Sequence, residues 1–263
     1  MPNFIKVDLH NHTTLCNHAE GELYEYIEEA IKQNIDIYGV SDHAPMDFDT
    51  KYRMSFSQMQ EYKEMVFKVK EKYKDQIEVL FAYEVDYLPG YMDKRVLDAD
   101  VDYLIGSAHF IDKWGFDNPE FIGKYEGADI DIIWQEYFDI IRDMAETQYF
   151  DIAGHLDLIK VFKYMPKGDI VEIAEEALQA IKNADMVLEL NVAGYRKPCA
   201  EPYPSRALLE RAFQIGIPIT FSSDAHKPDQ VGLFRKEIEE FAKEVGYTQC
   251  AYFRKRKRFM VNF

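Results

Sequence analysis

The sequence has few cysteines and no long apolar run, and each shortage excludes a class of protein. Only three of its 263 residues are cysteine, at the widely separated positions 16, 199 and 250. With no CxxC motif and no disulfide framework, the chain is expected in a reducing cytoplasm, with each cysteine a small packed residue. The longest apolar runs, such as MVLEL (186–190) and IPITF (217–221), are too short to span a bilayer. Because Lys6 and Asp8 interrupt the first apolar run, we expect neither a signal peptide nor a membrane partner.

Positive charge is also scarce. Lysine and arginine number 31 against 47 acidic residues, which gives a net charge of −16. A surface that binds nucleic acid needs the opposite sign, so we expect no nucleic-acid partner, whereas a small phosphorylated substrate is compatible. The exception is the basic run RKRKR (254–258). It is expected to form a solvated edge strand that its charges keep from pairing, the alternative being contact with a phosphorylated partner.

Short apolar runs alternate with amphipathic segments along the chain. The seven apolar runs, each a predicted strand, are 4–9, 36–40, 77–85, 102–108, 149–154, 185–192 and 217–223. The predicted helices are 22–34, 57–73, 130–146, 169–183, 205–216 and 232–245, and 110–128 is expected to be a loop. Such alternation predicts a parallel sheet, and seven or eight units in this length suit a closed βα barrel. An open doubly wound sheet is the alternative, although no GxGxxG follows the first run to support a dinucleotide-binding form.

All seven histidines lie at or just beyond the carboxyl end of a predicted strand. They are His10, His12 and, farther along the same loop, His18 after the first strand, His43 after the second, His109 after the fourth, His155 after the fifth and His226 after the seventh. In a barrel, the carboxyl ends of the strands share the face where active sites are built. The seven histidines are therefore predicted to be neighbours in space.

The spacing of these residues favours metal binding. His10 and His12 stand two apart on an extended segment and so point the same way, as do Asp224 and His226. Glu84, near the end of the third strand, adds a carboxylate that could bridge two ions. Imidazole and carboxylate together suit zinc, manganese or iron better than magnesium or calcium. A lone histidine at a strand end is more often structural, so the prediction rests on the whole set.

Three aspartates stand one or two residues from these histidines. They are Asp8, Asp42 and Asp157. A ligand histidine usually donates its second ring nitrogen to a carboxylate or carbonyl. Structural roles are favoured over catalytic ones for all three, and the side chain of Asp8 should point to the face opposite His10.

The motifs DLHNH (8–12), SDH (41–43) and SDAH (223–226), with Glu84 and the lone histidines between them, resemble the polymerase and histidinol phosphatase (PHP) family along nearly the whole chain. The length and the segments DLHNHTTLCNHAEG, HLDLIK and NVAGYRKP are most similar to monofunctional histidinol-phosphate phosphatases. The resemblance implies a distorted (β/α)7 TIM-like barrel, one domain over residues 1–263, with three divalent ions that could be zinc, manganese or iron.

The resemblance also implies how the ligands are shared. A first ion would be held by His10, His12, Glu84 and Asp224, and Glu84 would bridge to a second ion held with His109 and His155. The third would be held by His18, His43 and His226. Among these, His18 has the weakest support from the sequence because it lies on a loop.

The implied reaction is hydrolysis of L-histidinol phosphate to L-histidinol and phosphate, a step of histidine biosynthesis, by a hydroxide that bridges two metal ions. Arg196 is the expected phosphate clamp. Lys160 stands where an arginine is common in the family, so its expected phosphate contact lacks the bidentate fork. The proton donor to the leaving group would be Asp42, a metal-bound water or an unliganded histidine. Acidic groups would suit the amine and imidazole of the substrate, and Asp86 and Glu201 are candidates by position.

Two other functions are compatible with these residues. A phosphatase of the same family could act on another small phosphate or on phosphotyrosine, which turnover of the competing substrates would separate. A metal-binding module without catalysis is the other, but structural metal sites are usually closed four-ligand cages rich in cysteine. Histidine and carboxylate ligands at a barrel mouth, with an arginine nearby, favour an enzyme.

Overall fold

Seven strands form one parallel sheet in this computed structural model, which describes residues 4–263 and so leaves the first three residues of the predicted domain outside. The order in the sheet is β1-β2-β3-β4-β7-β8-β9. The strands are β1 (Val7–Asp8), β2 (Ile37–Val40), β3 (Glu78–Asp86), β4 (Tyr103–Ser107), β7 (Ile152–Ala153), β8 (Val187–Asn191) and β9 (Ile219–Ser222). Each lies within or extends by one residue a predicted apolar run, so all seven strand predictions are confirmed.

The first and last strands meet and close the sheet. The backbone N–H of Leu9 donates to the carbonyl of Phe221 at 3.0 Å, and that of Asp224 donates to the carbonyl of His10 at 2.7 Å. The predicted distorted (β/α)7 barrel is therefore confirmed, and the alternative of an open sheet is wrong. Closure also brings residues 10–12 beside residues 224–226, although more than 200 positions separate them in the sequence.

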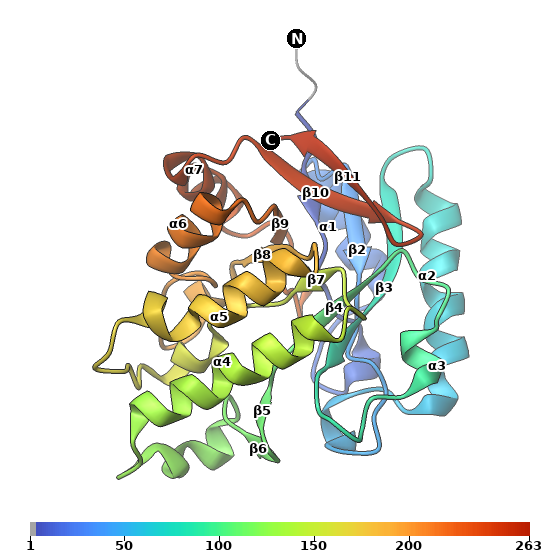
Figure 1. Ribbon diagram of the computed structural model, residues 1–263. Helices are drawn as coiled ribbons and strands as arrows, with labels where there is room; N and C mark the ends of the chain where they lie inside the picture. The colour runs from blue at the N-terminus through green and yellow to red at the C-terminus, as the bar shows by residue number, and fades with distance from the viewer. Residues whose placement is uncertain (1–3) are drawn as a thin grey trace.

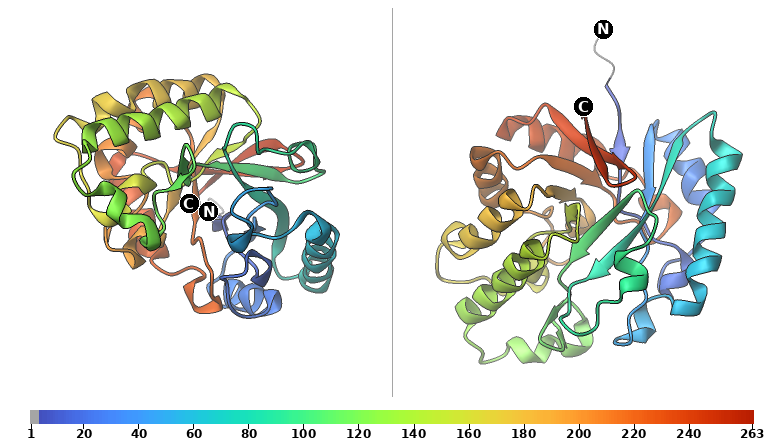
Figure 2. Two further views of the ribbon diagram at one scale, coloured as in Figure 1. Left: turned by 90° about the horizontal axis from the view of Figure 1, so that it is seen from below. Right: turned by 45° about the vertical axis from the view of Figure 1, so that its right-hand side comes forward.

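Helices surround the barrel, as the view from below shows (Figure 2). They are α1 (Leu23–Lys32), α2 (Met59–Tyr73), the short α3 (Lys94–Leu97), α4 (Ile130–Glu146), α5 (Ile170–Asn183), α6 (Arg206–Ile215) and α7 (Arg235–Val245). Apart from α3, each falls within a predicted helix. Helix α4 begins where the side chain of Asp129 accepts from Asp131 N, and it buries Trp134 and Ile141 against the sheet. Over residues 4–263, no helix is both long and apolar enough to cross a membrane.

The segment 110–128 was expected to be a loop and contains short elements. Strands β5 (Phe110–Ile111) and β6 (Trp114–Gly115) form a hairpin, and η4 (Pro119–Tyr125) follows. Asp112 takes a left-handed conformation, with φ of 53°, in the turn of this hairpin. Two-residue strands are too short to produce an alternating pattern, so no periodicity predicts them.

The barrel interior is filled by side chains. The fully buried phenol of Tyr103, on β4, donates to the carbonyl of Leu9 beyond β1, so it crosses the interior. A Cβ on Gly39, on β2, would lie 1.7 Å from the Tyr103 oxygen, so this strand needs glycine there. Because the interior is packed, a bound molecule can contact the barrel strands only at an end of the barrel.

The basic run forms part of a hairpin that lies across the end where the strands begin (Figure 1). Its strands are β10 (Gln249–Arg254) and β11 (Lys257–Asn262). Arg254 holds Glu78 through two contacts of 2.6 Å. Arg256 pairs with Asp151, and Arg258 with Asp185 at 2.9 Å. The prediction of an edge strand kept from pairing is wrong, because Lys255 and Arg256 form the turn of the hairpin and Arg254 is paired with Lys257 across it. The arginines are also not simply solvated, since they attach the hairpin to acids at the start of three barrel strands.

We expect Arg256→Ala to lower the free energy of unfolding by about 1 kcal/mol, because it leaves the largely buried carboxylate of Asp151 without its cation. Urea unfolding measures this. Lys236→Ala is the control, since that side chain is 85% exposed and its nearest acid lies 3.8 Å away. Equal stabilities of the two variants would show that the hairpin arginines do not stabilise the fold.

Candidate metal centre

One buried carboxylate lies at the centre of the histidine cluster. Glu84, on β3, is 1% exposed. Five imidazoles come within 3.7 Å of its two oxygens: His43 and His155 at 2.9 Å, His10 at 3.3 Å, and His12 and His109 at 3.7 Å. These histidines follow four different strands, so the barrel brings together residues that the sequence keeps apart.

The nine predicted ligands are all neighbours. Three groups, each with its ligand atoms within 4.8 Å of one another, are His10, His12 and Asp224; Glu84, His109 and His155; and His18, His43 and His226. These groups match the three ligand sets that the family resemblance implied. Glu84, which was also expected in the first set, lies 3.3 Å from His10 of that set. His18, which is exposed at the rim, lies with its ring 4.7 Å from that of His226. The structure thus brings His18 into the cluster despite its place on a loop.

Several nitrogen and oxygen atoms of the cluster are arranged to bind metal ions and do not form hydrogen bonds with one another. Nε2 of His10, Nδ1 of His43 and Oε2 of Glu84 are buried, and although the two nitrogens lie 3.3 and 2.9 Å from that oxygen, none of the three atoms makes a contact with hydrogen-bond geometry among residues 4–263. A buried polar atom left unpaired is costly. The free atoms face the same small space, and their types, imidazole nitrogen and carboxylate oxygen, are those that zinc, manganese and iron accept.

A second set of carboxylates fixes the rings. Oε1 of Glu189, on β8, lies 2.6 Å from Nδ1 of His10, and its Oε2 accepts from the backbone N–H of His155. Such a contact fixes which nitrogen carries the proton and leaves Nε2 free to bind a metal. Sequence reasoning missed Glu189, although it is the only charged residue within the apolar run 186–192. Asp8, as expected, points away from His10, and it binds Ser223 instead.

Asp42 and Asp86 play the same part for two other rings. Oδ1 of Asp42 lies 3.3 Å from Nδ1 of His12, and its other oxygen accepts from Thr13. Asp86 accepts from Nδ1 of His109. Both aspartates are buried. Asp86 was a candidate for the far end of the substrate by position alone, and this contact takes up one of its two oxygens.

Burial and mutual attraction set the charges of the cluster. Burial would raise the pKa of Glu84, but nearby histidines, His10 first, hold it well below the usual range. Burial would lower the pKa of His12, yet Asp224 and other carboxylates raise it to about 9. Burial lowers the pKa of His43 to about 4, outweighing the attraction of Glu84. Because metal ligands must give up such protons, ion binding here competes with protonation.

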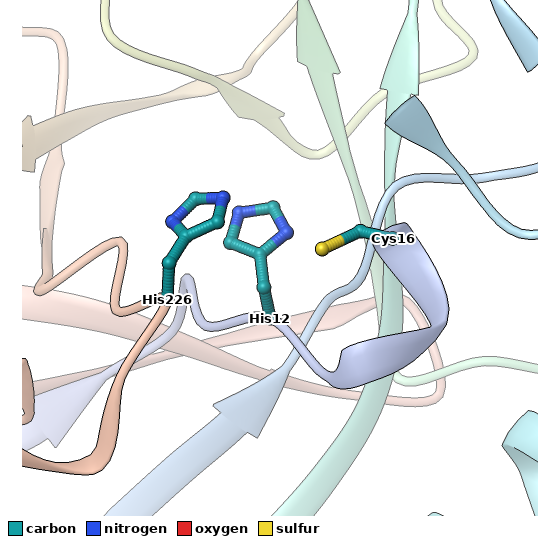
Figure 3. A group of neighbouring side chains, drawn as sticks. All are labelled: His12, Cys16 and His226. Carbon is teal, nitrogen blue, oxygen red and sulfur yellow. The ribbon is translucent and has the colours of Figure 1, made fainter. Parts of the chain in front are cut away.

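Cys16 lies beside the cluster, and Figure 3 shows its sulfur directed toward the ring of His12, with His226 on the other side of that ring. Its sulfur and a nitrogen of each histidine are within 4.8 Å of one another. Burial raises the pKa of the thiol, which favours the protonated form over the thiolate that binds metals. This agrees with the expected role of a packed residue.

Arg196 stands at the edge of the centre, at the end of η6 (Ala193–Arg196). Its Nη2 donates to the carbonyls of Ser223 and Asp224, both at 2.9 Å, which fixes the guanidinium beside a predicted ligand. Its Nη1 is buried and has no hydrogen-bond partner in the part of the chain that the structure describes. A fixed guanidinium with a free donor is suited to an anionic ligand.

Lys160, on η5 (Leu158–Phe162), is 1% exposed. Its Nζ lies 2.7 Å from the carbonyl of Pro202, 2.9 Å from Asp157 and 3.2 Å from Glu201. An ammonium has three donors, so each already has an acceptor. A phosphate contact by Lys160 stays a prediction, and one of these three contacts would have to open for it.

Comparison with known proteins agrees with this geometry. Residues 8–193 match the PHP domain family. The chain belongs to the PHP family. The match covers seven of the nine clustered side chains, from His10 to His155, and also Glu189; Asp224 and His226, after the last strand of the barrel, lie beyond it.

Known proteins match most of the chain. The probable histidinol-phosphatase of Deinococcus radiodurans is 36% identical over 95% of this chain and 97% of its own length. The histidinol-phosphatase of Bacillus subtilis is 27% identical over 86% and 96%. The crystal structure of histidinol phosphate phosphatase from Lactococcus lactis, complexed with zinc, L-histidinol and phosphate, superposes with a TM-score of 0.81 at 21% identity, covering 98% and 100% of the two chains. The last comparison confirms the barrel fold.

We expect Glu189→Gln to weaken metal binding by about 10- to 100-fold, because the neutral amide is a poorer acceptor for His10 and holds its ring less firmly. Chelator competition measures the affinity, with unfolding curves to confirm that the barrel is intact. Glu175→Gln is a matched control, since that carboxylate pairs only with residues on the outer helices. Wild-type affinity in Glu189→Gln would contradict the role assigned to this carboxylate.

Proposed function

We propose that this PHP-family protein is a metal-dependent phosphatase that hydrolyses L-histidinol phosphate to L-histidinol and phosphate. The observation that carries the proposal is the convergence of seven histidines, Glu84 and Asp224 at the barrel mouth beside a fixed guanidinium. The names of two relatives support the substrate, since the matches cover 95% and 86% of this chain and nearly the whole of each relative. The predicted cytoplasmic location accords with this function and rests on the scarcity of cysteine.

The ligand groups support a centre of three divalent ions. His10, His12 and Asp224, with Glu84, would hold the first. Glu84, His109 and His155 would hold the second, and His18, His43 and His226 the third. The zinc in the Lactococcus lactis structure supports zinc here, and the donor set also suits manganese or iron.

Ions bound in these groups would supply a water of lowered pKa as the nucleophile and positive charge to stabilise the phosphoryl oxygens. The side chains divide the remaining work. Arg196 is placed to hold a phosphoryl oxygen through its free Nη1, and the carbonyls of Ser223 and Asp224 keep it in position. Glu84 sets the spacing of the donor groups on its two sides.

The leaving alkoxide needs a proton. Asp42 is a candidate, but it is fully buried behind His12 and already accepts from Thr13 and the backbone of His43. These contacts support orientation of His12 as its main role. Asp42→Asn separates the two roles, since loss of a proton donor would remove the alkaline limb of the pH–rate profile, whereas loss of orientation would weaken metal binding.

The proposal is tested by phosphate release from L-histidinol phosphate, with para-nitrophenyl phosphate and phosphotyrosine beside it and a chelator control. We expect a strong preference for histidinol phosphate that the chelator abolishes. Activity on the other esters alone would contradict the substrate while preserving the chemistry. Bound metal without turnover of any ester would favour a non-catalytic metal-binding module.

We expect Glu84→Gln to abolish turnover and to lower the metal content, because one neutral amide replaces the carboxylate that five imidazoles surround. Elemental analysis and phosphate release measure the two effects on the same sample. Full activity in this variant would overturn the bridging role.

Arg196→Ala should leave the metal content unchanged and lower kcat/KM by about 100-fold, since it removes a fixed cation without touching a ligand side chain. The control is Arg206→Ala, on the outer side of α6, where the guanidinium pairs with surface acids. Equal kcat/KM values for the two variants would show that Arg196 does not contact phosphate.

A further inference from the structure

A buried arginine that is not itself a predicted ligand lies behind the cluster. Arg53 follows η2 (Thr50–Tyr52), in the connection between β2 and α2, and is 4% exposed. Its Nη1 lies 2.6 Å from Oδ2 of Asp86, and its Nε donates to the carbonyl of Asp49 at 3.1 Å. A buried guanidinium is tolerated only when it is well paired, and these contacts fix its plane.

Asp86 links this arginine to the metal centre. One of its oxygens takes Arg53 and the other accepts from Nδ1 of His109. The ring of His109 therefore presents Nε2 toward Glu84. Because each oxygen of Asp86 has its own partner, the carboxylate cannot rotate away from His109 without breaking the contact with Arg53.

The backbone of Arg53 reaches a second part of the centre. Its backbone carbonyl accepts a hydrogen bond from the side chain of Asn17 at 2.9 Å, and Asn17 immediately precedes His18 in the sequence. On the other side, the segment of Arg53 packs through Met46 and Phe48 against a small apolar cluster with Leu88 and Phe110. One residue thus joins the loop of His18 to the strand end that carries Asp86.

We propose that Arg53 is a positioning residue of the metal centre, holding His109 through Asp86 and the loop of His18 through its carbonyl. Within residues 4–263, the polar contacts of its side chain go to Asp49, Ala44 and Asp86, none of which is a predicted ligand. The inference rests on the proposed function only in taking the cluster to be a metal centre. It assigns a role to an ion pair that nothing in the sequence pattern indicated.

The proposal distinguishes Arg53 from an arginine that only stabilises the fold. Arg53→Met removes the charge and every N–H donor of the guanidinium while keeping most of the apolar stem. Arg53→Lys keeps a charge, but a single ammonium cannot reproduce the fork that joins Asp86 to Asp49. Arg95→Met is the matched control, since Arg95 is exposed on α3, where its guanidinium pairs with Asp93 and lies over the ring of Phe56, away from Asp86.

The test is zinc affinity by chelator competition on the full chain, with kcat, KM and urea unfolding on the same preparations. We expect Arg53→Met to bind its weakest zinc about 10- to 100-fold less tightly and to lose kcat at limiting zinc. KM should be unchanged, and excess zinc should restore kcat. Arg53→Lys should fall between this variant and the wild type, and Arg95→Met should match the wild type.

Wild-type zinc affinity and kcat in Arg53→Met would overturn the proposal, even if that variant unfolds more easily. If Arg53→Met does not fold, the lysine variant decides, and wild-type affinity there would overturn the proposal as well. Zinc affinity is measured without substrate. If the wild-type protein binds zinc but does not hydrolyse histidinol phosphate, the proposed function is wrong. The zinc affinities of these variants would still test the role of Arg53.

Discussion

The attraction between Glu84 and the five imidazoles around it is the interaction on which the centre depends. Burying a carboxylate is costly unless charges or donors compensate it. Here the compensation comes from side chains that follow four strands of the barrel. The barrel must close for them to meet, because His10 and His12 follow the first strand while their neighbours Asp224 and His226 follow the last.

A second layer of acids holds the imidazoles at fixed angles. Glu189, Asp42 and Asp86 each contact Nδ1 of one ring, and all three lie on or just after strands of the barrel. Arg53 adds a cation behind Asp86, so the chain of contacts extends from the ligand to a surface loop. Ligand geometry is therefore set by rigid strands together with a few buried ion pairs.

The strand positions could be inferred from the sequence because each strand is an apolar run. The candidate ligands followed from them because each histidine lies at or just beyond the end of such a run. Residues at the ends of parallel strands converge whatever lies between them. Glu189 could have been found as the one acid in an apolar strand. Arg53 could not, because its partner is 33 residues away and its own segment has no periodic pattern. The three acceptors of Lys160 and the ion pairs of the hairpin arginines are likewise tertiary contacts without a local signature.

The measurement that tests the central claim most directly is the number of metal ions bound per chain, determined by elemental analysis of the wild-type protein after loading with zinc and removal of the excess. The arrangement of ligand groups around Glu84 predicts three ions. One ion or none, in protein shown to be folded, would contradict the account, because the unpaired nitrogen and oxygen atoms of this buried cluster would then have no partner that explains them.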